Sequence, residues 1–272
     1  MKAPDFEYRR PQTVAEAIVL LGSGEDAMPL AGGQSLMPMM NLRMARPDIL
    51  VDLNRIEGLA FIRDEGEHLR VGAMTRMADL LASPLVAEAL PLFALALPHI
   101  AHAAVRNRGT IGGSVALADP AAEMPALLLA QNATIVLEGP AGRRTVAADD
   151  FFLGIYETAR EPDELIVEIV LPKAGGPFGF CELARRHGDY AMAGVAVALG
   201  TPRVAFFGVA DRAVRAPGAE AALAGKDAGD EEAIAAAIAT LDIEFAGDLH
   251  TSAATKRHYA GVVLKRALKG AA

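Results

Sequence analysis

Cysteine is nearly absent from this chain, and tryptophan is absent altogether. Cys181 is the single cysteine among 272 residues. One thiol can form no internal disulfide, and it cannot hold an iron–sulfur cluster alone because such clusters are held by several cysteine ligands. The sequence therefore predicts that Cys181 is a small packed residue and that the chain holds no cluster of its own.

Long apolar runs and an excess of positive charge are also lacking. The longest apolar stretch, 89–105, is interrupted by Pro91 and Pro98 and carries His99 and His102, whereas a spanning helix needs roughly twenty apolar residues. The amino-terminal MKAPDFEYRR has no apolar segment behind it, which argues against a secretory signal. The formal net charge of −8 argues against a nucleic-acid partner. We expect a soluble cytoplasmic protein with no membrane span.

Several signatures of catalytic and nucleotide sites are missing. No GxGxxG follows a strand and no GxxxxGK[ST] occurs, so neither a Rossmann domain nor a P-loop is expected. The segments that begin at Gly33 and Gly112 lack the last glycine of the GxSxG motif of serine hydrolases. His99 and His102 have no carboxylate at metal-ligand spacing. The sequence predicts no catalytic residue and no metal site.

The first fifty residues alternate helix and strand. Thr13 and Glu16 have capping-box spacing and predict a helix that ends at Gly22. Ser35 predicts the start of a second helix, through about Met44, in which a proline is tolerated because it lies in the first turn. Short apolar segments predict strands at 28–31 and 48–53. This alternation favours a small α/β unit.

The middle of the chain combines hairpins with short helices. Turn residues predict hairpins within 61–71 and 134–146, and an apolar strand is expected at 164–171. Helices are predicted at 75–81, 84–97, 98–105 and 120–130.

A linker is predicted at KAGGPF (173–178), where glycine and proline gather between two strand-like segments. Beyond it, strands are predicted before helices, an α+β order. We therefore expect one domain at 1–173 and another at 178–272. The predicted strands are 179–185, 191–199 and 204–210, and the predicted helices are 219–224, 231–241 and 255–268.

Two glycine loops of similar design suggest a phosphate site. AGGQS (31–35) and TIGGS (110–114) each place two glycines before a small hydroxyl residue. Glycine permits positive φ and close approach of backbone N–H groups to a ligand, and successive N–H groups form an anion-binding nest. One such loop alone is more simply an ordinary tight turn. The pair favours a diphosphate, which has two charged groups to bind.

The chain also resembles a known family over nearly its whole length. It is similar to the FAD-binding medium subunit of molybdenum hydroxylases, which include carbon monoxide dehydrogenase, xanthine dehydrogenase and bacterial N-heterocycle dehydrogenases. The resemblance is carried by AGGQSLMPMMNLRMARPDILVDLNRI (31–56), RNRGTIGGSVALADPAAEMPALLLA (106–130), DDFFL (149–153), RRHGDYA (185–191) and DLHTSAATKRHYAGVVLKRAL (248–268).

The resemblance implies a fold and a set of partners. The fold is α+β: two α/β subdomains, about 1–56 and 57–173, form a PCMH-type FAD-binding domain, and a smaller domain at 178–272 has a three-stranded antiparallel sheet plus helices. Electrons would pass from a molybdopterin centre on a large subunit, through [2Fe-2S] clusters on a small subunit, to FAD and then to NAD, a quinone or oxygen. The implied assembly is a dimer of heterotrimers.

The resemblance also implies site residues. In the family, the two loops wrap the FAD diphosphate, a carboxylate three residues after the Asp-Pro pair contacts the ribityl chain, and an aromatic ring lies near the isoalloxazine with two charged neighbours. The matching residues are Ala31, Gly32, Gly33, Gln34, Ser35, Thr110, Ile111, Gly112, Gly113 and Ser114 for the diphosphate, Glu123 for the ribityl chain, and Tyr190, Arg185 and Asp189 for the ring.

One departure from the family pattern indicates which branch of the family this chain resembles. Carbon monoxide and xanthine members usually have GGN in the second loop, with another polar residue three positions on. Ser114 and Leu117 occupy those positions here, which favours a branch other than carbon monoxide dehydrogenase proper. Two other functions stay open: a stand-alone FAD-dependent reductase on the same scaffold, and a non-catalytic nucleotide-binding protein.

Overall fold

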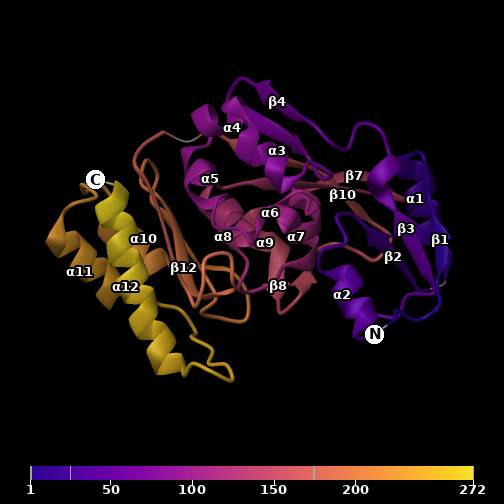
Figure 1. Cartoon of the computed structure of the whole chain (residues 1–272). Helices are drawn as coiled ribbons and strands as arrows, with labels where there is room; N and C mark the ends of the chain where they lie inside the picture. Colours follow the sequence, from indigo (N-terminus) through magenta and orange to yellow (C-terminus); the bar gives the residue numbers. More distant parts are fainter. Residues whose placement is uncertain (1, 25, 174, 272) are drawn as a thin grey trace.

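Three units follow one another along the chain (Figure 1), from the indigo amino-terminal unit through the magenta middle unit to the yellow carboxy-terminal unit. The computed structural model describes residues 2–24, 26–173 and 175–271. Each unit contains its own sheet.

The first unit is a small parallel sheet with two helices. Its strands lie in the order β1-β3-β2. The predicted capping box is confirmed: the N–H of Glu16 donates to Thr13 Oγ1 at 3.2 Å, and the Glu16 side chain accepts from the N–H of Gln12 at 2.7 Å. The elements are β1 (Glu7–Arg9), α1 (Val14–Leu21), β2 (Ala27–Leu30), α2 (Leu36–Asn41), β3 (Ile49–Asp52) and the short 3₁₀ helix η1 (Leu53–Arg55).

The second unit has a five-stranded antiparallel sheet in the order β4-β5-β10-β6-β7. Both predicted hairpins form, and the helices between β5 and β6 pack on the sheet through a large apolar core. The strands are β4 (Ile62–Glu65), β5 (His68–Gly72), β6 (Thr134–Gly139), β7 (Gly142–Ala147), β8 (Phe152–Gly154), β9 (Glu157–Thr158) and β10 (Leu165–Pro172). The helices are α3 (Met77–Ala82), α4 (Pro84–Ala89), α5 (Pro91–Ala96), α6 (Ala103–Arg106), α7 (Ile111–Leu117), α8 (Glu123–Ala130) and α9 (Ala148–Phe151).

The third unit packs its sheet between helices of two different units. Side chains of β12 and β13 alternate: Val195 and Phe206 belong to a core shared with α12, whereas Ala196 and Phe207 belong to the core that contains α8. Burial on both faces explains why β12 is a continuous apolar run. The elements are β11 (Phe178–Ala184), β12 (Ala191–Ala198), β13 (Arg203–Phe207), β14 (Val214–Arg215), α10 (Pro217–Leu223), α11 (Glu231–Ala239) and α12 (Ala253–Ala271).

This sheet corrects the sequence prediction of three strands. A fourth strand, β14, pairs antiparallel with β13 through Val214 and Arg215. Two residues give no recognisable strand pattern, and they are extended only because the edge of β13 supplies hydrogen-bond partners.

Several helix predictions were too long, and three differ most from the structure. The helix from Ser35 ends at Asn41 rather than at Met44, the segment 84–97 breaks at Pro91 into α4 and α5, and only Ala103–Arg106 of the helix predicted near 98–105 forms. Proline explains the break, because it cannot donate a backbone hydrogen bond within a helix.

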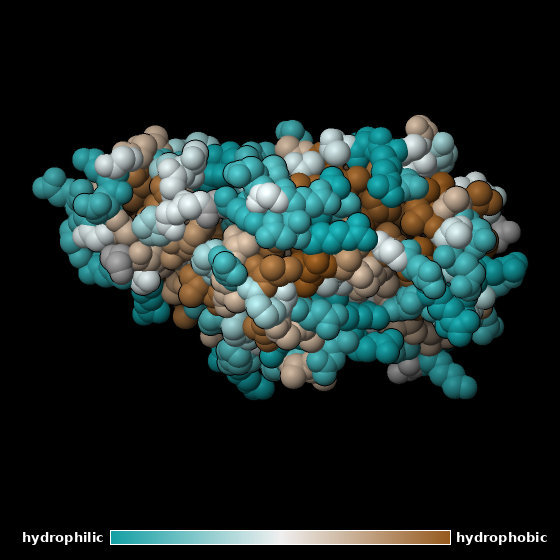
Figure 2. All heavy atoms as spheres, turned by 90° about the horizontal axis from the view of Figure 1, so that it is seen from above, coloured by the Kyte–Doolittle hydropathy of each residue, from teal (hydrophilic) through white to brown (hydrophobic). Residues whose placement is uncertain are grey.

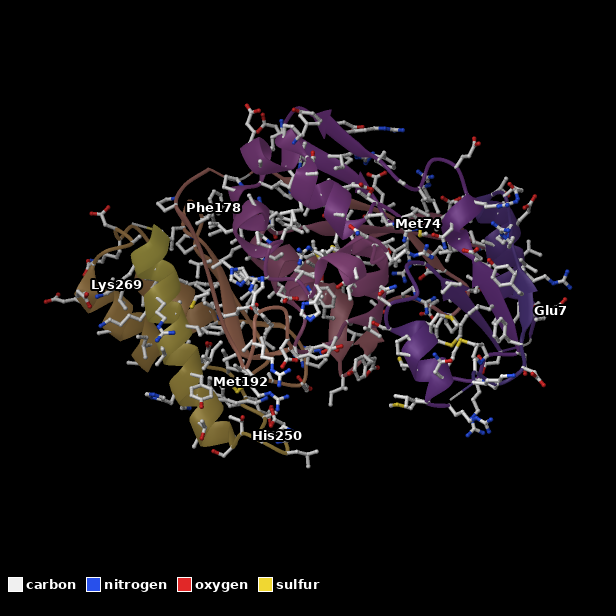
Figure 3. All side chains as sticks on the ribbon, in the orientation of Figure 1. Glu7, Met74, Phe178, Met192, His250 and Lys269 are labelled. Atoms are coloured by element: carbon white, nitrogen blue, oxygen red, sulfur yellow. The ribbon has the colours of Figure 1, made fainter. Side chains whose placement is uncertain are left out.

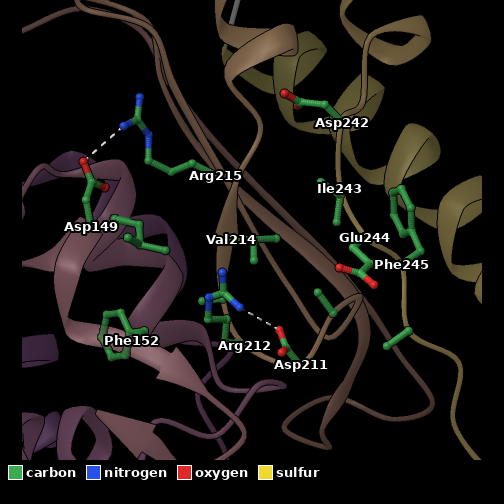
Figure 4. A pocket seen from close by; sticks show the side chains of 14 residues that line it. Asp149, Phe152, Asp211, Arg212, Val214, Arg215, Asp242, Ile243, Glu244 and Phe245 are labelled. Carbon is green, nitrogen blue, oxygen red and sulfur yellow. Dashed lines mark hydrogen bonds and ion pairs between the residues drawn. The ribbon is translucent and has the colours of Figure 1, made fainter. Parts of the chain in front are cut away.

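Ion pairs join the second unit to the third beside a 740 Å³ cavity, and Figure 4 shows the one between Asp149 and Arg215. Asp149, on α9, accepts from Arg203 Nη2 at 2.5 Å and from Arg215 Nη1 at 3.1 Å. The Arg203 side chain is only 13% exposed, and its Nε also donates to the carbonyl of Leu129 at 2.6 Å. One carboxylate therefore binds two strands of the neighbouring unit.

We expect Asp149→Ala to destabilise the junction of these units by about 1–2 kcal/mol, because it leaves two guanidinium groups without their shared partner. Urea unfolding should show the loss, and the loss should shrink at high salt because salt screens exposed charges. Asp150→Ala is the matched control and should change stability little, since both carboxylates are exposed but, among the described residues, only Asp149 pairs with arginines. Equal stability of the two variants would show that the ion pairs of Asp149 do not stabilise this junction.

The face of the molecule seen from above (Figure 2) is mostly hydrophilic. Viewed from above, apolar residues reach the surface in separate groups among hydrophilic ones (Figure 2). Across the described ranges, no helix combines the length and the hydropathy that a membrane span requires.

Candidate functional site

A cavity of about 510 Å³ lies where the three units meet. Met74, labelled in Figure 3, lines it at the junction of the first and second units. Most of the residues predicted from the sequence line this one cavity: Ala31, Gly32, Gly33, Gln34, Ser35, Thr110, Gly112, Gly113, Ser114, Glu123, Asp189 and Tyr190. Ile111 is buried behind the wall. Arg185 lies outside the wall, with Nε 3.9 Å from Asp189 Oδ2.

The first glycine loop has the geometry of an anion nest. Gly33 has a φ of 71°, in the left-handed region that favours glycine. Within the described part of the chain, no acceptor pairs with the backbone N–H groups of Gly32, Gly33 or Gln34. The hydroxyl of Ser35 makes no capping bond to α2. Donors without internal partners, at the end of a cavity, suit phosphate oxygens.

The second glycine loop is built differently from the prediction. Gly112 and Gly113 lie in the first turn of α7 and have no positive φ. Their N–H groups are already used: Gly112 donates to the carbonyl of Ala73 at 2.8 Å, and Gly113 donates to Thr110 Oγ1 at 3.1 Å. The prediction that both glycine loops form anion-binding nests was therefore wrong for this second loop. Its glycines serve close packing instead.

The packing between the two loops leaves no room for side chains. A Cβ at Gly32 would lie 2.3 Å from the carbonyl oxygen of Arg108, and a Cβ at Gly112 would lie 2.6 Å from the Cβ of Ala73. A Cβ at Gly113 would lie 2.9 Å from Thr110 Oγ1 and 3.5 Å from the Cβ of Ala31. Glycine therefore lets the second loop support the first from behind and present Ser114 to the cavity.

A polar network that the sequence analysis missed connects the two loops. Arg76 donates through Nη1 to the carbonyl of Arg108 and through Nη2 to Asn54 Oδ1 at 2.5 Å. Asn54 Nδ2 in turn donates to the carbonyl of Ala31 at 2.9 Å. One guanidinium thus fixes the spacing of both loops. No local signal marks Arg76 or Asn54, because their partners are distant in sequence.

Two arginines that were not predicted line the cavity itself. Arg106 donates through Nη1 to the carbonyls of Ile100 and Ala101 at 2.9 and 2.8 Å. Arg160 donates through Nη1 to the carbonyl of Glu164 at 2.8 Å. Their charge favours an anionic ligand in a chain whose overall charge is negative. The basic segment RNR at 106–108, directly before the second glycine loop, could have indicated Arg106 as a cavity residue.

The cavity wall also carries acidic residues and an aromatic one. Glu123 begins α8 and is 8% exposed, and this burial raises its pKa to about 7. Burial also raises the pKa of Asp119, whose Oδ1 accepts from the N–H of Ala121 at 2.9 Å. Tyr190 is 64% exposed at the mouth. A carboxyl that titrates near neutrality can both donate and accept hydrogen bonds, which suits a ligand rich in hydroxyls.

The raised pKa of Glu123 makes folding of the ligand-free chain pH-dependent. Because its pKa is about 7 in the folded chain against an ordinary 4.5, the folded state retains a proton that the unfolded state loses, and stability falls as pH rises between these values. Relative to wild type, Glu123→Gln should gain stability with rising pH up to about neutrality, reaching about 2–3 kcal/mol.

Urea unfolding at several pH values measures this difference. Glu88→Gln, which changes an exposed glutamate on α4, is the control and should show no such trend. A Glu123→Gln difference that stays constant with pH would mean that Glu123 is ionised throughout.

Comparison with known proteins is consistent with this geometry. The family described as "FAD binding domain in molybdopterin dehydrogenase" matches residues 4–174, and that described as "CO dehydrogenase flavoprotein C-terminal domain" matches residues 178–271. The chain belongs to the FAD-binding medium-subunit family of molybdenum hydroxylases. It is therefore the FAD-binding medium subunit of a multi-subunit oxidoreductase.

Individual relatives cover the whole chain. The carbon monoxide dehydrogenase medium chain of Hydrogenophaga pseudoflava is 47% identical over 100% of this chain and 98% of its own length. The nicotine 6-hydroxylase medium subunit of Paenarthrobacter nicotinovorans is 39% identical over 98% of each chain. Quinoline 2-oxidoreductase from Pseudomonas putida 86 superposes with a TM-score of 0.93 at 37% identity, covering 100% of this chain and 98% of that one.

The comparisons bear on two points raised by the sequence. The relatives are subunits, which favours the subunit role over a stand-alone reductase. A carbon monoxide dehydrogenase chain stands among the relatives with high identity, and the branch that Ser114 and Leu117 indicate stays a prediction. Leu117 lines the cavity with its apolar side chain.

Proposed function

We propose that this chain binds FAD in the 510 Å³ cavity and relays electrons between a partner's [2Fe-2S] clusters and an external acceptor. The observation that carries the proposal is the first glycine loop: the N–H groups of its residues 32–34 have no acceptor among the described residues, and the loop lines a cavity that also contains Glu123 and Tyr190. FAD, when bound, would supply the redox chemistry.

Each part of the cavity has a role in this proposal. Residues 31–35 bind the diphosphate through main-chain N–H groups and the Ser35 hydroxyl, and Thr110–Ser114 supports them and adds the Ser114 hydroxyl. Glu123 hydrogen-bonds the ribityl chain. Tyr190 borders the isoalloxazine, and Asp189, which accepts from the N–H of Tyr190 at 3.0 Å, positions it. Arg185 acts through Asp189.

The domain division is part of the proposal. We infer an FAD-binding domain at 1–173, with subdomains of about 1–56 and 57–173, and a second domain at 178–272. The separate sheets of the three units and the two family matches, 4–174 and 178–271, support this division.

The proposed partners complete the electron path. They are a large subunit with molybdopterin and a small subunit with two [2Fe-2S] clusters, arranged as a cytoplasmic dimer of heterotrimers. Relatives described as medium chains support this arrangement, since the description implies larger and smaller chains.

Purification tests the proposal directly. The chain expressed with its neighbouring genes should be yellow, contain one FAD per chain, and co-purify with a large and a small subunit. A colourless chain that binds no FAD would contradict the cofactor assignment. A chain that reduces a small substrate with NADPH unaided would contradict the subunit role.

A further inference from the structure

A lysine on α12 is almost fully buried in the third unit. Lys256 is 7% exposed, and it belongs to the segment 248–268, none of which lines the 510 Å³ cavity. Its Nζ donates to the carbonyl of Gly208 at 2.7 Å and lies 2.8 Å from Asp248 Oδ2. Burial of an ammonium group costs free energy unless hydrogen bonds and an opposite charge offset the lost hydration. These two partners therefore account for the burial of Lys256.

The carboxylate partner of Lys256 also orders the loop before α12. Oδ1 of Asp248 accepts from the N–H groups of His250 and Thr251 at 2.8 and 2.9 Å. His250, labelled in Figure 3, lies at the outer end of this loop. At the start of the loop, the N–H of Ala246 donates to the carbonyl of Val209 at 2.9 Å. The loop is thus fixed to the turn after β13 at one end and to Lys256 at the other.

Gly208, in that turn, connects Lys256 to the cavity wall. Its N–H donates to the carbonyl of Pro120 at 2.7 Å, and Pro120 directly follows the cavity-lining Asp119. The turn is tightly packed, because Gly208 has a φ of 74° and a Cβ there would lie 2.6 Å from the carbonyl oxygen of Ala191. Ala191 directly follows the cavity-lining Tyr190. One peptide segment therefore contacts both walls that carry these cavity residues.

Another buried charged residue of the third unit lacks this connection. Glu220, on α10, is 8% exposed. It accepts from the N–H of Val204 and from Arg215 Nε, each at 2.9 Å. None of these three residues lines the 510 Å³ cavity. A change at Glu220 should therefore weaken the third unit without moving the cavity wall, which makes it the comparison for Lys256.

We propose that Lys256 is a positioning residue for the bound flavin, an inference that rests on the proposed FAD function. Its ammonium group fixes the carbonyl of Gly208, the N–H of Gly208 holds Pro120, and Pro120 sets the position of residues 119–123 against the cofactor. Both connecting hydrogen bonds are 2.7 Å long. Coupling between two sites is reciprocal, so FAD binding should in turn stabilise the loop that Lys256 holds.

FAD titration and visible circular dichroism of the full chain test this role. Lys256→Met removes the ammonium group but keeps an unbranched side chain, and it should raise the Kd for FAD about tenfold. At saturating FAD it should also change the circular dichroism of the flavin, because the wall beside the cofactor shifts. Lys256→Arg, which keeps the charge and the donors, should restore most of both. Glu220→Gln should lower the Tm of the chain but keep the wild-type Kd and spectrum.

Hydrogen–deuterium exchange of the wild-type chain tests the same coupling without a substitution, and it decides alone if Lys256→Met does not fold. Saturating FAD should slow amide exchange in residues 246–256 and leave exchange in α11 unchanged. Unchanged exchange in 246–256 would overturn the proposal. So would a wild-type Kd and flavin spectrum in Lys256→Met, or an equal loss of FAD affinity in Glu220→Gln. A wild-type chain that does not retain FAD would instead overturn the proposed function, so the two failures are distinguishable.

Discussion

Gly33→Val and Gly113→Val should each abolish FAD retention, lowering affinity by at least about a hundredfold, or about 3 kcal/mol. The two changes act for different reasons. Gly33 has a φ of 71°, and a β-branched residue disfavours that conformation, so the loop would turn its free N–H groups away from the ligand. At Gly113 the backbone is helical, but the added side chain would meet Thr110 and press on Ala31.

Flavin content per purified chain and titration of the apo chain with FAD measure this effect. Gly58→Val is the matched control: Gly58 also has a positive φ, of 80°, but a Cβ there would meet nothing within 4 Å, and it does not line the cavity. The control should lose a little stability and keep its FAD. Stoichiometric FAD in both loop variants would refute the loop assignment.

Arg76→Ala should weaken FAD binding about tenfold and reduce stability by about 2–3 kcal/mol. Removing this guanidinium breaks the link between the carbonyl of Arg108, two residues before the second loop, and Asn54, which binds the carbonyl of Ala31 in the first loop. The cost is large because charge-assisted hydrogen bonds are lost and their partners are left unsatisfied. Arg76 does not line the cavity, so the loss of affinity reports loop spacing.

Thermal unfolding of the apo chain and FAD titration together measure both effects. Arg76→Lys should be intermediate, because one ammonium cannot reproduce the forked geometry of the guanidinium. Arg55→Ala, which removes an exposed arginine nearby on η1, is the control and should leave both quantities near wild type. Full FAD affinity in Arg76→Ala would show that the loops hold their spacing without it.

Structural features that depend on residues close together in the sequence were predicted well. The capping box at Thr13 and Glu16, the hairpin turns and the apolar strand β10 form as expected, since each depends on residues a few positions apart. The first glycine loop belongs to the same class, because a positive φ at Gly33 follows from the residue type and its neighbours.

Features that depend on distant partners were not predicted. The strand β14 exists because β13 lies beside it, and the network of Arg76 with Asn54 requires three separated segments to meet. The second glycine loop shows most clearly what the sequence cannot predict. Its sequence resembles that of the first loop, yet its N–H groups donate to the carbonyl of Ala73 and to Thr110 Oγ1.

The amino-acid sequence by itself therefore determined the family resemblance, the order of the units and the place of the nest at Ala31–Ser35. Only the tertiary structure decided that the second loop supports the first and that Arg76 sets their spacing. The physical reason is that backbone preferences are local, whereas the pairing and burial of a charged side chain depend on what folding places next to it.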